Sequence, residues 1–162
     1  MTSSLTDLGG LPVVEVGDHP DTAAAEHWLA SLDPQPVLAC THLVRDPRPH
    51  VTWTLVFDGD IPAGLPPATP GAARDGGRAV VYPGVGRLTG EITVGDVLAG
   101  SAIDRVEILG GGEAEPSAVL RTNEYVRPQW RDGMLVLMTM PAVGGVLVPF
   151  ETRNPTPCCA AH

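Results

Sequence analysis

The chain has 162 residues, enough for one domain with a substantial core, and 43% of them are hydrophobic, as in a typical globular protein. Its net charge of −9 lacks the positive balance with which proteins attract nucleic acid or an anionic membrane surface. All ten basic residues are arginines, which excludes a Schiff-base lysine and a lysine-bearing phosphate loop. We therefore expect neither a nucleic-acid nor a membrane partner.

The composition changes twice along the chain. Residues 1–20 look irregular, residues 21–152 are expected to form a single β-rich domain, and residues 153–162 form a tail rich in cysteine and histidine. Residues 1–7 lack the basic and apolar character of a signal peptide, and no stretch approaches the ~20 apolar residues of a membrane helix. Three cysteines cannot all pair with one another, so we expect reduced thiols and a cytoplasmic location.

One helix is expected near the N-terminus. Residues 22–32 are rich in alanine and place Trp28, Leu29 and Leu32 in one apolar stripe. Asp18 or Asp21 supplies the N-terminal cap, and the Asp-Pro pair at 33–34 ends the helix.

Strand patterns dominate the rest of the chain. The clearest alternation, over 50–57, puts Val51, Trp53, Leu55 and Phe57 on one face. Strands are expected at 37–44, 50–57, 78–82, 86–93, 102–109, 118–126, 134–140 and 146–151, with a long loop at 58–77.

Short connections between the last four strands indicate an antiparallel meander. The predicted fold class is therefore mainly β, a small antiparallel barrel or sandwich with one packed N-terminal helix. Its single core is expected to hold Trp53, Leu55, Phe57, Leu135, Leu137 and Val148.

Two groups of thiol and imidazole side chains suggest a metal site. Cys40 and His42 are two positions apart on a predicted strand and therefore share a face, while the tail supplies Cys158, Cys159 and His162. If the tail folds back onto that strand, the ligand types suit a tetrahedral zinc site. The alternative is that Cys40 is a small core residue, His42 a partly buried histidine, and the tail a frayed end.

Polar residues within the predicted strand at 118–126 suggest a second site. Arg121, Asn123 and Arg127 alternate on one face, where guanidinium groups would select an anion, and Glu124 and Tyr125 are the catalytic candidates. The alternative is a solvated sheet face with ordinary cross-strand ion pairs.

These observations favour a cytoplasmic binding or assembly module whose chemistry is a Cys/His soft-metal site, with zinc as the only expected cofactor. Two alternatives remain open at this stage. One is a small cofactor-free enzyme with an anion-selecting pocket on the strand at 118–127, and the other is a structural subunit of a larger assembly. A homo-oligomer, or a protein partner that engages the C-terminal tail, is the expected interaction.

Overall fold

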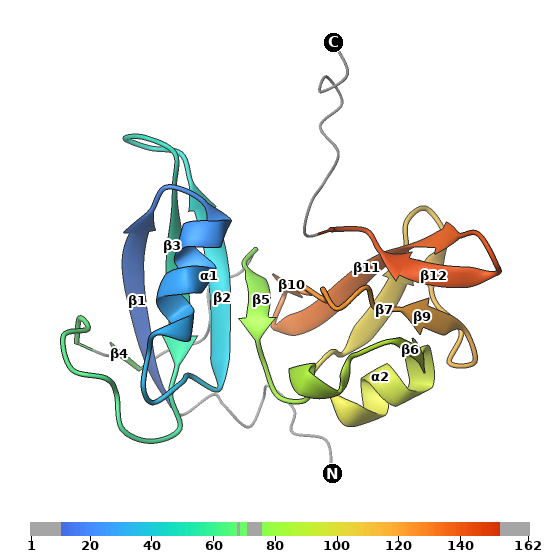
Figure 1. The fold of residues 1–162 in the computed structure, drawn as a ribbon, viewed down its shortest axis with the longest axis horizontal. Coiled ribbons are helices and arrows are strands. Elements are labelled where there is room, and N and C mark those ends of the chain that lie inside the picture. The colour runs from blue at the N-terminus through green and yellow to red at the C-terminus, as the bar shows by residue number, and fades with distance from the viewer. Residues whose placement is uncertain (1–10, 68, 71–75, 153–162) are drawn as a thin grey trace.

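The computed structural model describes residues 11–67, 69–70 and 76–152 of the chain, and within these ranges the protein is mainly β with two α-helices (Figure 1). Its strands form one mixed sheet of 12 strands that does not close into a barrel. The bounds of the strands are β1 Pro12–His19, β2 Leu38–Val44, β3 His50–Val56, β4 Thr69–Pro70, β5 Arg78–Val81, β6 Glu91–Thr93, β7 Arg105–Ile108, β8 Gly112–Glu113, β9 Val119–Arg121, β10 Gln129–Arg131, β11 Met134–Ala142 and β12 Val146–Pro149.

The sheet has two halves with β5 between them (Figure 1). Strands β1 to β4 and helix α1 make the first half, and β6 to β12 with helix α2 make the second. The main path of the sheet runs β4-β1-β3-β2-β5-β10-β11-β12-β9-β6. Each segment that the sequence predicts as a strand contains one, although most are shorter than predicted.

Helix α1 (Thr22–Ala30) is the predicted N-terminal helix. The Oδ1 atom of Asp21 accepts a 2.8 Å hydrogen bond from the amide of Ala24, so Asp21 satisfies one of the free amides of the first turn. Ala25 and Leu29 are buried against the sheet. Neither α-helix in the described ranges has the length and apolar character needed to cross a membrane.

Residues 12–19, expected to be irregular, form strand β1, which pairs antiparallel with β3. Gly17 has a φ of +118° where the register shifts between Val16 and His19, and this irregularity interrupts the period-two pattern in the sequence. Helix α2 (Val94–Gly100) was also not expected. The hydroxyl of Thr93 caps it, and Val94 and Val97 are its buried residues.

The second half is not the expected meander, because β11 pairs with three other strands. One edge of β11 pairs antiparallel with β10 over 134–136 and then with β12 over 139–142. The opposite edge pairs with β7 in parallel, and β12 pairs with β9 in parallel. The sheet therefore forks at the middle of β11, where β10 has ended and β12 begins.

Two core clusters replace the single predicted core. The α1 core lies between α1 and the first half of the sheet and contains Trp53, Leu55 and Phe57. The shared core lies on the other face, contains Leu135 and Leu137, and takes residues from both halves, whereas Val148 is only partly buried. Successive residues of the central strands point to opposite faces, and both faces are buried. The alternation of apolar residues in the sequence therefore could not show that there are two cores.

Candidate functional site

A cavity of about 170 Å³ lies at the fork of the sheet. Strands β5 and β10 approach it from one side, and the end of β12 approaches it from the other. Its lining residues are Arg78, Leu109, Arg127, Gln129, Arg131, Leu137, Met138, Pro149, Phe150 and Glu151. The cavity is smaller than the roughly 300–1,000 Å³ of typical ligand pockets, so it suits a group about the size of one side chain.

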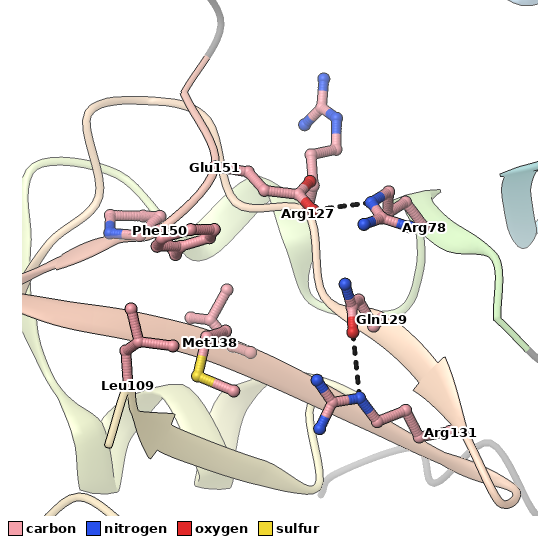
Figure 2. Close-up of a pocket in the computed structure, with 10 residues that line it drawn as sticks. Arg78, Leu109, Arg127, Gln129, Arg131, Met138, Phe150 and Glu151 are labelled. Atoms are coloured by element: carbon pink, nitrogen blue, oxygen red, sulfur yellow. Dashed lines mark hydrogen bonds and ion pairs between the residues drawn. The ribbon is translucent and has the colours of Figure 1, made fainter. Parts of the chain in front are cut away.

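The two sides of the cavity differ in chemical character (Figure 2). The apolar side chains of Phe150, Met138 and Leu109 lie together on one side, and the polar side chains of Arg131 and Gln129 lie on the other. Such a cavity fits a ligand with an apolar body and a charged or polar end.

Among the three arginines that line the cavity, Arg131 is the most available to a ligand. Its Nε donates a 2.9 Å hydrogen bond to Oε1 of Gln129, which fixes the direction of the guanidinium (Figure 2). The side chain is exposed, and within the described ranges it has no carboxylate partner. A guanidinium with free Nη donors is suited to bind a carboxylate.

Arg78 and Arg127 are already paired. The Nε of Arg78 donates a 2.6 Å hydrogen bond to Oε1 of Glu151, and Arg127 donates a 2.7 Å bond to Oε1 of Glu26 on α1. Arg127 also lies over the ring of Tyr125, 4.2 Å from its centroid, and its side chain is only 13% exposed. In Figure 2 its guanidinium points away from the apolar wall, so its role is to join the two halves.

The structure does not bring together the predicted anion-binding residues Arg121, Asn123 and Arg127. Strand β9 ends at Arg121, and Asn123 and Glu124 have φ values of +53° and +54° in the turn that follows. Arg121 donates a 3.0 Å hydrogen bond to Glu91 at the edge of the sheet. Only Arg127 of the three lines the cavity, because the turn ends the alternation on which the prediction depended.

The two catalytic candidates are also separate from each other. The Oε1 of Glu124 accepts a 2.7 Å hydrogen bond from the amide of Gly90, so this carboxylate helps to hold the turn. Tyr125 lies under Arg127 and lines a second depression, of about 180 Å³, beside α1. Glu124 and Tyr125 therefore do not converge on one point as a catalytic base and acid of a shared site would.

Cys40 and His42 share a face of β2, as the sequence predicts. A side chain at Gly77 would contact both residues, with its Cβ 2.6 Å from Cε1 of His42 and 3.2 Å from Cβ of Cys40. His42 forms a 2.7 Å hydrogen bond through Nε2 with the hydroxyl of Thr54, and burial raises the pKa of the Cys40 thiol to about 12.

The three tail ligands of the predicted metal site, Cys158, Cys159 and His162, lie outside the described residues. Among the residues that are described, no three His, Cys, Asp or Glu side chains are grouped closely enough to hold a metal ion. Because a metal-bound cysteine must be a thiolate, the raised pKa of Cys40 opposes its use as a ligand. The zinc site stays a prediction.

A larger open depression of about 540 Å³ lies beside the N-terminus of α1. Its two charged residues other than histidine, Asp21 and Arg45, have opposite signs, and Asp21 is already used as the cap of α1. The cavity at the fork therefore has the more specific chemistry.

The site predicted from the sequence did not include Arg78, Gln129 or Arg131. These residues meet because β5 pairs with β10 at Arg78 and Gln129, a contact between strands that are distant in the chain. The only local signal was the alternation of Gln129 and Arg131 around the buried Trp130. No family model matches the chain, and no curated protein or solved structure is significantly similar to it.

Proposed function

We propose that the protein is a binding module that recognises a carboxylate group attached to an apolar body. The observation that supports this function is Arg131, an exposed guanidinium held by Gln129 on one side of a cavity whose other side is apolar. Of the three arginines that line the cavity, Arg131 is the one without a carboxylate partner in the described ranges. A charge-assisted hydrogen bond to it would contribute about 1.5–3 kcal/mol.

The size of the cavity favours a binding role over catalysis on a whole metabolite. A volume of about 170 Å³ resembles that of a cavity which accepts benzene, roughly 150 Å³. One aromatic or aliphatic side chain with a nearby carboxylate therefore fits, and a nucleotide does not. We thus keep the expectation of a binding or assembly module, and we propose that its site lies at the fork of the sheet instead of in the tail.

The test uses 3-phenylpropionate as a probe and its uncharged amide as the matched compound. We expect the acid to bind with a dissociation constant of about a millimolar and to shift the NMR signals of the Gln129 side-chain amide and Arg131 Nε. Arg131→Gln, which removes the Nε signal itself, should abolish the shift of the Gln129 amide. Arg45→Gln, which removes the same charge from the first half, should preserve both shifts. Equal shifts with the amide, or unchanged binding in Arg131→Gln, would contradict the proposal.

A further inference from the structure

Arg78 and Arg131 are diagonal neighbours on one face of the sheet. Arg78 pairs in register with Gln129, and Arg131 follows Gln129 by two positions on β10, so the three side chains point to the same face. Diagonal neighbours of this kind lie roughly 7–8 Å apart, a distance that long side chains can span. Both arginines line the cavity at the fork of the sheet, so a ligand held by Arg131 lies within reach of Arg78 as well.

The chain itself supplies the carboxylate that occupies Arg78. The Nε of Arg78 donates a 2.6 Å hydrogen bond to Oε1 of Glu151, which lies just after the end of β12 (Figure 2). The side chains of Arg78 and Glu151 are 39% and 31% exposed, and both line the cavity. Glu151 therefore holds the position that a second carboxylate of a ligand would otherwise take.

The third arginine of the cavity does not offer a second anion site either. Arg127 donates a 2.7 Å hydrogen bond to Glu26 on α1 and lies over the ring of Tyr125. In Figure 2 its guanidinium points away from the apolar wall of the cavity. Among the described residues, the cavity thus has one arginine, Arg131, whose charge no carboxylate compensates.

We propose that Glu151 is the residue that limits the ligand to a single carboxylate. By pairing with Arg78, it withdraws that guanidinium from the ligand, and its own charge repels a second carboxylate in the cavity. This inference rests on the proposed function, because it concerns the same cavity. It adds that the ligand is a monocarboxylate and that a dicarboxylate of similar shape gains nothing from its second charge.

A purely structural ion pair would have a different consequence. Glu151 follows β12 and Arg78 begins β5, so the pair also joins two segments that are distant in the chain. If this were its only role, loss of the carboxylate would lower stability and leave the choice of ligand unchanged. Because both side chains are about one-third exposed, solvent screens the pair and its effect on stability is small. The choice of ligand is therefore the effect to measure.

The test compares 3-phenylpropionate with 2-benzylsuccinate, which is the same molecule with an added carboxymethyl group. The monoamide of 2-benzylsuccinate, with its amide on the added group, has the same shape without the second charge. In NMR titrations, we expect the wild type to bind 2-benzylsuccinate no more tightly than this monoamide. Glu151→Gln should bind 2-benzylsuccinate about tenfold more tightly than the wild type does, because Arg78 is then free to bind the second carboxylate. Its affinity for the monoamide should stay close to that of the wild type.

Glu26→Gln is the matched control, because it removes the same charge from the chain but frees Arg127, whose guanidinium points away from the apolar wall. It should keep the ligand preference of the wild type. Adding Arg78→Gln to Glu151→Gln should abolish the gain, which would identify Arg78 as the group that binds the second carboxylate. Glu151→Ala replaces Glu151→Gln if the latter fails to fold.

Three outcomes would overturn the inference while leaving the proposed function intact. They are the absence of a gain in Glu151→Gln, an equal gain in Glu26→Gln, and a gain that persists without Arg78. A wild type that already prefers 2-benzylsuccinate to its monoamide by about tenfold would overturn it as well. Failure of 3-phenylpropionate to bind the wild type would instead remove the proposed function and, with it, this inference.

Discussion

Glu26 and Arg127 are 101 positions apart in the chain, yet their side chains form an ion pair with a 2.7 Å hydrogen bond. Glu26 belongs to α1 in the first half, and Arg127 belongs to the segment that enters β10 in the second. The pair therefore connects the two halves on the same face of the sheet as the candidate site.

A double-mutant cycle over Glu26→Gln and Arg127→Gln should give a coupling energy of about 1 kcal/mol. The two side chains are 33% and 13% exposed, so solvent screens the pair only in part. Arg121 and Glu91, which are 45% and 51% exposed, provide the control cycle, where we expect a few tenths of a kcal/mol at most. A larger coupling in the control pair, measured by urea unfolding, would contradict this ranking.

Gly84→Ala should destabilise the protein by more than about 2 kcal/mol. Gly84 has a φ of +86°, and a Cβ there would overlap the carbonyl oxygen of Gly100 at the end of α2. Gly110→Ala is the matched control, because Gly110 has a φ of +75° and a Cβ there would meet no atom within 4 Å. Gly110→Ala should lower the free energy of unfolding by only about 1 kcal/mol, the cost of a left-handed backbone at alanine. Equal losses of stability in the two variants would show that the structure relaxes to relieve the contact with Gly100.

Stability should fall in alkaline solution because of Cys40. Burial raises the pKa of this thiol from its ordinary 9.0 to about 12, so the unfolded chain releases the proton at a lower pH than the folded protein does. The stabilisation is complete below about pH 9 and is lost as the pH rises towards about 12, at about 1.4 kcal/mol per pH unit. Burial raises the pKa of Tyr82 as well, which adds a loss above its ordinary value of 10.0.

Urea unfolding of the wild type and of Cys40→Ala between about pH 8 and about pH 10.5 measures this effect. The unfolding free energy of the variant should decline less steeply with pH. The difference in slope should approach the contribution of one proton, about 1.4 kcal/mol per pH unit. Parallel declines in the two proteins would mean that Cys40 ionises equally in the folded and unfolded states.

The predicted zinc site is tested by melting the full chain and a chain that lacks residues 158–162, each with and without a chelator. If the site is structural, deletion and chelation should each lower the melting temperature. The free energy of unfolding should fall by roughly 4 kcal/mol when the metal is present at a thousandfold excess over its dissociation constant. Four equal midpoints would exclude a structural metal and leave Cys40 as a core residue, in agreement with its burial.

The sequence predicted those elements whose patterns are local. Helix α1 was recognisable from its Asp21 cap and its alanine-rich stripe, and β3 from the alternation over 50–57. Strand β10 has only three residues, and α2 has only two turns, so neither produces a periodic signal. The parallel pairing of β7 with β11 joins two segments that are distant in the chain, so no local pattern in the sequence predicts it.

The candidate site was predictable only in part for the same reason. Arg127 was predicted to bind an anion, and its side chain lines the cavity. Its guanidinium, however, already forms an ion pair with Glu26. Arg131 takes its position from the pairing of β10 with β11 and β5, which no local pattern encodes. Arg121 looked equivalent to Arg127 in the sequence, but the turn at Asn123 and Glu124 places it elsewhere.

The shared core has a consequence for how the protein unfolds. Strands β5 and β10 have a single residue pair in register, which by itself would allow the two halves to open independently. However, Leu38 and Val56 of the first half and Leu120 and Leu137 of the second are buried in the same cluster. Unfolding of either half would therefore expose apolar surface of the other half to water. We expect amide hydrogen exchange in β3 and in β11 to require the same global unfolding. Although the sheet has two halves, we expect the protein to unfold as one cooperative unit.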